Sequence, residues 1–124
     1  MNEISVKMRE IQSIPHRGEI WLVKFQKKES LGTEVWKTRP AVVISADWQN
    51  TKSQRVVVIP FSRTLPIYEW EIPINLNNQT GKIMTDQVHS FDKKKRLVRK
   101  VGILPAEILK ELETTLKELL ELGN

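Results

Sequence analysis

The sequence predicts a mainly β fold: a small, strongly bent antiparallel sheet of the SH3-like, partly open barrel kind, followed by one C-terminal helix. Three observations predict it. Short apolar or alternating segments recur, turn-forming residues separate them, and a single long amphipathic segment lies near the end. With 124 residues and 40% hydrophobic content the chain can build one modest core, so we expect an N-terminal extension over residues 1–15 and one domain over residues 16–124.

Six segments have the composition of β-strands. They are residues 19–25, 41–45, 56–60, 69–74, 82–88 and 97–104. The second and third are apolar at nearly every position, which indicates burial on both faces of the sheet. The fourth alternates and contains Pro73, which suits an edge strand because proline cannot donate to a ladder. Loops are expected at residues 26–38, 47–54, 62–68 and 75–81.

One helix is expected near the C-terminus. Pro105 fits its first turn, and Gly123 is a suitable stop. A leucine-rich stripe can cover an open end of the sheet, formed by Ile108, Leu109, Leu112, Leu116, Leu119 and Leu120. The polar face is acidic, which argues against a membrane-surface helix. The first fourteen residues have a weaker helical phase and form either a short amphipathic segment or an ordered arm.

The composition excludes several classes of protein. The chain has no cysteine, so it holds neither a disulfide framework nor a thiolate zinc site. Two histidines without clustered carboxylates make no persuasive metal site. No apolar run approaches the roughly 20 residues of a membrane span, and residues 1–15 lack the apolar block of a signal peptide. We therefore expect a cytoplasmic protein that needs no metal or other cofactor.

The net charge of +5 is unevenly distributed. Residues 82–100 hold seven Lys or Arg against two Asp, whereas residues 101–124 hold five Glu against two Lys. A concentrated basic stretch suits a polyanion, because each cation that neutralises a phosphate releases condensed counterions. A solvated, lysine-rich hairpin is the alternative interpretation of the same stretch.

Arg39 is the most informative single residue. It stands before Pro40 and the apolar run of residues 41–44. Pro40 disfavours helix at Arg39, so the guanidinium lies in an extended approach to a buried strand. A cation held at the mouth of a strand can bind a phosphate, although the motif alone also fits an ordinary surface arginine.

Several blocks in register resemble the MazF/PemK toxin family. They are RGEIWLV at 17–23, TRPAVVI at 38–44, VVIPFS at 57–62, DQV at 86–88, and DKK at 92–94 before Val101, Gly102 and the closing helix. The resemblance covers about residues 16–122. It implies the toxin component of a type II toxin-antitoxin system: a homodimeric barrel that cleaves single-stranded RNA without metal, in many members leaving a cyclic phosphate. It further implies silencing by an antitoxin, which we expect to be acidic and partly disordered.

The resemblance implies two catalytic residues. The family's arginine maps onto Arg39, and its threonine or serine at the end of the third strand maps onto Ser62. Cleavage by a 2′-hydroxyl requires stabilisation of charge on the phosphate, besides proton transfers at the 2′ and 5′ oxygens. Because arginine almost never loses its proton, Arg39 suits charge stabilisation better than base catalysis. Ser62 would donate a hydrogen bond to a phosphate oxygen.

Asp86 and His89 are further catalytic candidates. Some branches of the family place an arginine two residues before the aspartate, but this chain has Met84 there. Asp86 therefore has a structural alternative, pairing with backbone or with an arginine. His89 stands where relatives often have a basic residue, and it either transfers protons or merely stacks or binds a phosphate.

Other residues are expected to hold the RNA strand. Trp36 can stack on a base, and the basic residues after Asp92 can follow the flanking backbone. His16 can approach the cleft from the first strand, although an exposed histidine beside a turn is the alternative. The RNA-contacting candidates are His16, Arg17, Trp36, Lys37, Arg63, Gln87, Lys93, Lys94, Lys95 and Arg96. A core or interface role is the alternative for tryptophans, first for Trp21 and Trp70.

Two other functions fit the same shape. One is an inhibitor of a protein target such as a topoisomerase, comparable to the related CcdB toxins, in which Arg39 and Ser62 would be dispensable. The other is a noncatalytic module that binds RNA or antitoxin. The departures at Met84 and His89 keep this second alternative open.

Overall fold

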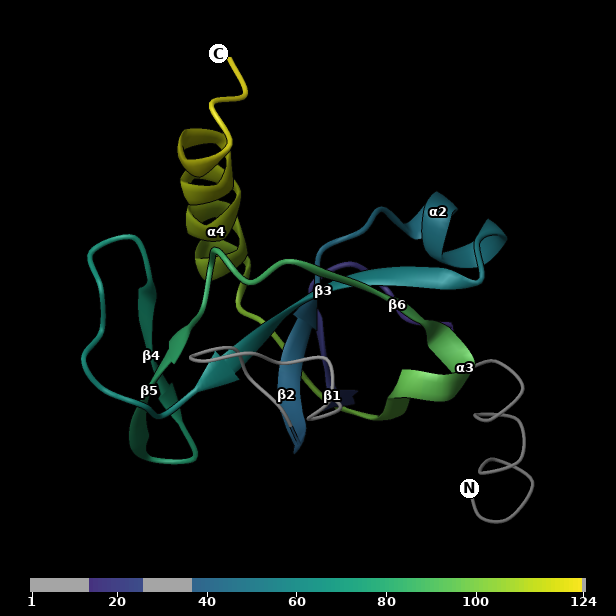
Figure 1. Ribbon diagram of the computed structural model, residues 1–124, viewed down its shortest axis with the longest axis horizontal. Helices are drawn as coiled ribbons and strands as arrows, with labels where there is room; N and C mark the ends of the chain where they lie inside the picture. The colour runs from purple at the N-terminus through teal and green to yellow at the C-terminus, as the bar shows by residue number, and fades with distance from the viewer. Residues whose placement is uncertain (1–13, 26–36, 124) are drawn as a thin grey trace.

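The computed structural model describes residues 14–25 and 37–123. The segment or arm proposed for the first fourteen residues, apart from residue 14, and the candidate stacking residue Trp36 lie outside the described residues. Figure 1 shows the elements, which are β1 (Glu19–Phe25), β2 (Lys37–Val43), α2 (Asp47–Lys52), β3 (Arg55–Ser62), β4 (Ile72–Leu76), β5 (Gln79–Ile83), β6 (His89–Asp92), α3 (Lys93–Arg96), β7 (Leu97–Ile103) and α4 (Ala106–Leu119).

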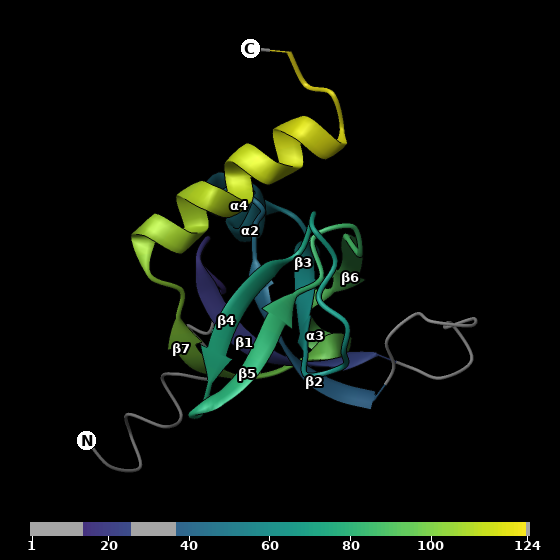
Figure 2. The same cartoon turned by 90° about the vertical axis from the view of Figure 1, so that its left-hand side faces the viewer.

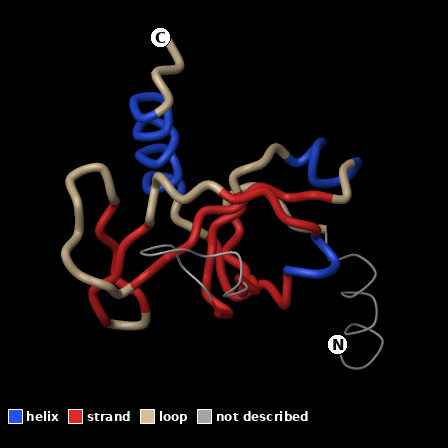
Figure 3. The backbone as a smooth tube through the Cα atoms, viewed as in Figure 1, coloured by secondary structure: helices blue, strands red, loops and turns tan. Residues whose placement is uncertain are grey.

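The strands form one curled antiparallel sheet, which confirms the expected fold class. Its order is β4-β5-β3-β2-β1-β7, and β6 pairs with β3 beside this path. The long strand β3 joins the two parts, since Arg55–Val58 pair with β6 whereas Phe61 and Ser62 pair with β5. The strands curl into a half-barrel, as the tube in Figure 3 shows. Pro73 lies on the edge strand β4, as its missing donor predicts.

The central strands are buried on both faces, as their apolar sequences predict. Successive side chains of a strand point to opposite faces. On β2, Ala41 and Val43 therefore join one apolar cluster with Val58 of β3, whereas Val42 joins a second cluster with Ile59 and Phe61. The second cluster is covered by α4, which stands at one end of the sheet near β4 and β5 (Figures 1 and 2).

Helix α4 is shorter than its sequence pattern predicts. Leu112 is fully buried, and Ile108, Leu109 and Leu116 pack against the second cluster. The last two residues of the stripe, Leu119 and Leu120, are exposed because the helix extends past the sheet. The helix ends at Leu119, and Glu121 rather than Gly123 takes the left-handed conformation after it, with φ of 52°. No helix within the described residues is long and apolar enough to cross a membrane.

Several boundaries differ from the sequence expectations. β2 begins at Lys37, four residues before the predicted start, and the predicted loop 47–54 contains α2. The predicted strand 82–88 is wrong as one element: β5 ends at Ile83, and β6 begins at His89 after a turn. The four residues of α3 follow Asp92, whose side chain accepts a hydrogen bond from the Lys95 amide at 2.9 Å. Helices of four and six residues are too short to produce a recognisable period.

The predicted loop 75–81 is a tight hairpin. Leu76 pairs with Gln79, so only Asn77 and Asn78 form the turn, with φ of 53° and 65°. Asparagine tolerates this left-handed conformation, which two-residue hairpin turns require. Consequently β4 extends to Leu76 and β5 begins at Gln79, and Gly81 lies within the strand.

A buried ion pair fixes the segment between β3 and β4. Lys82 Nζ lies 2.8 Å from Glu71 Oε1, and both side chains are almost fully buried, with 3% and 2% exposure. The ammonium group also donates to the Pro66 carbonyl oxygen at 2.8 Å, and Glu71 Oε1 accepts from the Tyr68 amide at 2.9 Å. These bonds satisfy the charges inside the fold and attach residues 66–71 to β5.

We predict that breaking this buried pair destabilises the protein strongly. Glu71→Gln leaves the Lys82 charge buried without a counter-charge, which is expected to lower the free energy of unfolding by about 3–5 kcal/mol. Urea denaturation measures the change. The control is Glu113→Gln, which breaks the partly exposed Arg17–Glu113 pair, with side-chain exposures of 32% and 43%. Loss of this pair should lower the free energy of unfolding by at most about 1 kcal/mol. Equal losses in the two variants would contradict the prediction.

The stability of the protein should also depend on Glu19 in acid. Burial raises the pKa of Glu19, but hydrogen bonds from the His16 amide and Trp21 indole and the ammonium of Lys100 together lower it below 4.5. A lowered pKa contributes stability at neutral pH that is lost as the pH falls from about 4.5 through the folded-state pKa. Urea denaturation at pH 7 and pH 3 should show a smaller loss for Glu19→Gln than for the wild type. An equal loss would assign the acid sensitivity to other groups.

Candidate active site

The site begins where β2 and β3 stop pairing. Their ladder runs from Val43–Val58 to Ala41–Pro60. Continuing this register by two residues brings Arg39 alongside Ser62, but no ladder joins them. On β2 the next residue that would donate to β3 is Pro40, which has no N–H to extend the ladder. β2 remains paired with β1 here, through Val23 and Arg39, so the arginine is carried on regular backbone.

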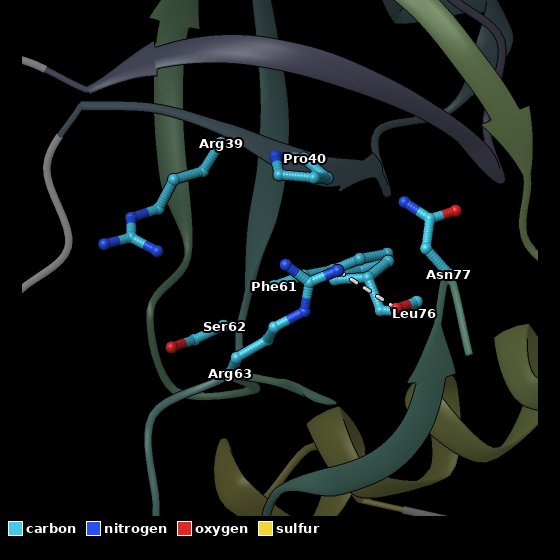
Figure 4. Close-up of a pocket in the computed structure, with 7 residues that line it drawn as sticks. All are labelled: Arg39, Pro40, Phe61, Ser62, Arg63, Leu76 and Asn77. Carbon is cyan, nitrogen blue, oxygen red and sulfur yellow. Dashed lines mark hydrogen bonds between the residues drawn. The ribbon is translucent and has the colours of Figure 1, made fainter. Parts of the chain in front are cut away.

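The gap between the strands is a pocket of about 230 Å³. Arg39 and Ser62 both line it, together with Pro40, Phe61, Arg63, Leu76 and Asn77. In Figure 4 the guanidinium of Arg39 and the hydroxyl of Ser62 point to the same side from neighbouring strands. The Arg63 side chain points the other way, toward Phe61 and Leu76, and donates to the Leu76 carbonyl oxygen at 3.0 Å. Three of the predicted residues, the catalytic candidates Arg39 and Ser62 and the RNA-contacting candidate Arg63, thus line one concave, cationic pocket.

Ser62 is held closely by its neighbours. It is 4% exposed, and its Oγ accepts a hydrogen bond from the Thr64 amide at 3.0 Å. Accepting this bond leaves the hydroxyl proton available to donate to a ligand. A Cβ on Gly81 would lie 3.3 Å from the Ser62 carbonyl oxygen, so a larger residue here would require β3 or β5 to shift by a few tenths of an ångström.

His89 lies in an aromatic cluster. Its ring is 5.1 Å from the rings of both Phe25 and Phe91, edge-on to the first and stacked on the second. Phe25 and Phe91 belong to the first apolar cluster with Ala41, and Arg39 leaves β2 on the same face, two residues before Ala41. His89 therefore shares a face of the sheet with Arg39, and its ring packs against two phenylalanines of the protein.

The turn between β5 and β6 carries Asp86. Met84, which replaces the arginine of some relatives, is 8% exposed and packs in the first cluster. Its amide donates to the Pro60 carbonyl oxygen at 3.0 Å, where β3 changes partners. Asp86 is exposed two residues later, and Gln87 is half-buried with its amide bonded to the Met84 carbonyl oxygen at 2.9 Å. The turn thus presents a carboxylate while burying an apolar side chain.

Part of the predicted basic surface lies at the same end of the sheet as Arg39. Arg96 donates to the Lys24 carbonyl oxygen at 3.0 Å and lies 4.3 Å from the centre of the Phe91 ring. Lys24 pairs with Thr38, next to Arg39 and the exposed Lys37. On α3, Lys94 and Lys95 are exposed. The ammonium group of Lys93 instead donates a hydrogen bond to the carbonyl oxygen of Asn50 on α2.

His16 and Arg17 are not brought together with Arg39. Gly18 bonds to the Val43 carbonyl oxygen, so the turn that precedes β1 lies at the opposite end of β2. Arg17 binds the Ile44 carbonyl oxygen and Glu113 of α4, at 3.1 and 2.7 Å. His16 lies 3.5 Å from Asp47, and hydrogen bonding from the Arg17 amide lowers the pKa of that carboxyl. These contacts join the first turn to α2 and α4.

Sequence reasoning missed an aromatic pair beside the site. Trp21 is 6% exposed, as its core assignment predicts, but Trp70 is 38% exposed and stacks on Tyr68. Its alternation with Ile72 and Ile74 suggested a strand position, whereas β4 begins only at Ile72. The one available signal was the pair of aromatic residues flanking Glu69 in a predicted loop-to-strand transition. Among the described residues, no group of three His, Asp or Glu is placed to hold a metal ion.

Comparison with known proteins identifies the family. The sequence profile described as "PemK-like, MazF-like toxin of type II toxin-antitoxin system" matches residues 16–120. The chain belongs to this family. The match confirms the family that the sequence motifs predict.

Relatives with known names or structures agree with this assignment. Endoribonuclease MazF9 of Mycobacterium tuberculosis (strain ATCC 25618 / H37Rv) is 31% identical over 117 residues, covering 86% of this chain and 96% of the relative. MazF from Deinococcus radiodurans has the same fold with a TM-score of 0.76 and 24% identity, over 87% and 97% of the two chains. A mycobacterial endoribonuclease solved with its cognate antitoxin gives a TM-score of 0.68 and 18% identity, over 90% and 97%.

Proposed function

We propose that this toxin is an endoribonuclease that cleaves single-stranded RNA without a metal ion, with Arg39 and Ser62 at the phosphate that is cut. The observation that carries the proposal is the convergence of these two side chains in one pocket at the divergence of β2 and β3. The name of the MazF9 relative supports the reaction class. A protein-inhibitor role gives no reason for a guanidinium and a hydroxyl to share this pocket.

The chemistry would proceed by attack of the ribose 2′-oxygen on the adjacent phosphorus. As the new P–O bond forms, the bond from phosphorus to the 5′-oxygen breaks, giving a 2′,3′-cyclic phosphate and a free 5′-hydroxyl. Arg39 would neutralise the charge that accumulates on the non-bridging oxygens, and the Ser62 hydroxyl would donate to one of them. The 2′-proton must leave and the 5′-oxygen must gain a proton; the exposed Asp86 carboxylate is the candidate for one of these transfers.

The basic residues would hold the flanking strand. Lys37 and Arg96 lie at the same end of the sheet as Arg39, and Lys94 and Lys95 extend this charge along α3. Such a surface also suits an acidic, partly disordered antitoxin segment, and the mycobacterial endoribonuclease solved with its cognate antitoxin supports this kind of partner. We propose that the protein acts as a homodimer in the cytoplasm.

Removing either catalytic side chain should abolish most of the cleavage. Arg39→Ala is expected to lower the rate about 10²–10³-fold, as loss of a preorganised charge-stabilising donor does, and Ser62→Ala should lower it less because its donor is neutral. Incubation with a long RNA in EDTA, followed by mapping of the fragment ends, measures both. Lys110→Ala on α4 is the control for loss of a surface cation and should cut normally. Undiminished cleavage by Arg39→Ala and Ser62→Ala would contradict the site assignment. A folded wild-type protein that cleaves no RNA would contradict the proposed enzyme activity.

Charge reversal on α3 should weaken RNA binding in a salt-dependent way. Loss of one phosphate contact reduces the slope of log K against log salt by about 0.7 for single strands, so Lys94→Glu should flatten the slope by at least about this amount. Titrations of a single-stranded oligonucleotide at several salt concentrations measure the slope. Lys110→Glu makes the same charge change on the far helix and controls for net charge. Identical slopes for the two variants would place α3 outside the RNA footprint.

A further inference from the structure

Tyr68 and Trp70 form an exposed stacked pair between β3 and β4. Their ring centres are 4.9 Å apart and the rings are nearly parallel, with an interplanar angle of 6°. Both remain open to solvent, at 47% and 38% exposure. Two stacked aromatic rings on the surface of a small domain bury less apolar area than the core could offer them, so their position calls for a use beyond folding.

The pair is held by bonds to buried groups. Glu71 and Tyr68 exchange hydrogen bonds, from the Glu71 amide to the Tyr68 carbonyl oxygen and from the Tyr68 amide to Glu71 Oε1, each 2.9 Å long. The fully buried Thr85 donates its hydroxyl to the Trp70 carbonyl oxygen at 2.6 Å. The Lys82 ammonium lies 5.2 Å from the centre of the Tyr68 ring. The rings are thus placed before any ligand arrives.

These contacts place the pair next to the catalytic pocket. Lys82, which supports the Tyr68 ring, is the residue of β5 that pairs directly with Ser62. Cross-strand partners present their side chains on the same face of a sheet. Thr85, which anchors Trp70, immediately precedes Asp86. The aromatic pair is therefore connected to the pocket through Ser62, and separately to the turn that carries Asp86.

We propose that the Tyr68–Trp70 pair is a stacking platform for one unpaired base of the RNA strand whose phosphate lies at Arg39 and Ser62. This inference rests on the proposed function. A flat ring suits the face of any base, and a fixed ring holds it at little entropic cost. Glu69 is exposed between the two aromatic residues in the sequence and would repel a phosphate, so the platform favours a neutral base over the backbone. The platform would set where the strand enters or leaves the pocket.

The test uses a short RNA that spans a mapped cleavage site, with 2′-deoxyribose at the nucleotide whose 2′-oxygen attacks, so that it binds without being cut. Fluorescence anisotropy gives its dissociation constant. Trp70→Ala should weaken binding about tenfold, as loss of one stacked base does, whereas Trp70→Phe should retain most of the affinity. Trp48→Ala is the matched control, because Trp48 is 69% exposed on α2, outside the pocket. Thermal unfolding of each variant confirms that it is folded.

A second arm identifies the base. In a series of probes that each lack one base, one probe should bind the wild type about tenfold more weakly, and Trp70→Ala should not weaken its binding further. The platform would be contradicted if Trp70→Ala bound the probe with wild-type affinity, or if its loss of affinity added fully to that of every abasic probe. Cleavage of RNA by the wild type would still support the proposed enzyme activity in either case. Light scattering measures the oligomeric state of each variant. If Trp70→Ala lost the dimer but bound RNA with unchanged affinity per dimer, the pair would contact a second copy of the chain rather than a base, and the inference would be wrong.

Discussion

The end of the β2–β3 ladder is the constraint on which the rest of the site depends. Two strands that have packed their side chains into both cores separate after Ala41 and Pro60, where Pro40 has no N–H to continue the ladder. Had pairing continued, Arg39 and Ser62 would be ordinary cross-strand neighbours and no pocket would separate β2 from β3. Because each strand keeps its other partner, β1 on one side and β5 on the other, the separation adds little mobility. A rigid opening in a sheet places a cation and a hydroxyl with far better reproducibility than a loop could.

The Lys82–Glu71 pair shows how the fold supports this opening from behind. A fully buried charge pair is costly to desolvate and is weak evidence for stability in itself. Here its use is positional: the ammonium binds residues from the segment after Ser62 and belongs to the residue that pairs with Ser62. One lysine therefore couples the end of β3, the last residues of β5 and the aromatic residues between β3 and β4. An apolar replacement could fill the space without directing the segment.

The sequence predicted those features that follow from local chemistry. The apolar runs predicted the buried strands, Pro73 predicted the edge strand, and several blocks in register, the one around Arg39 among them, predicted the family and two residues of the pocket. It failed where tertiary contacts decide. Lys82 looks like one member of a basic stretch but is buried by a carboxylate eleven residues earlier in the chain. Arg17 looks like a ligand for phosphate but is bound by Ile44 and Glu113, and Trp70 looks like a core residue although the strand begins two positions later. None of these partners is adjacent in sequence.

The fixed segment between β3 and β4 also determines which partner must adapt when the two molecules meet. Because the rings of the proposed platform are already held in place, binding of a base there would cost the protein little freedom, and the cost of ordering would fall on the RNA. A nucleotide held in a hairpin stem would first have to leave its stack and its pairing partner. The secondary structure of a transcript would therefore shield some matching sites and expose others, and warming that melts weak stems would enlarge the set of vulnerable messages.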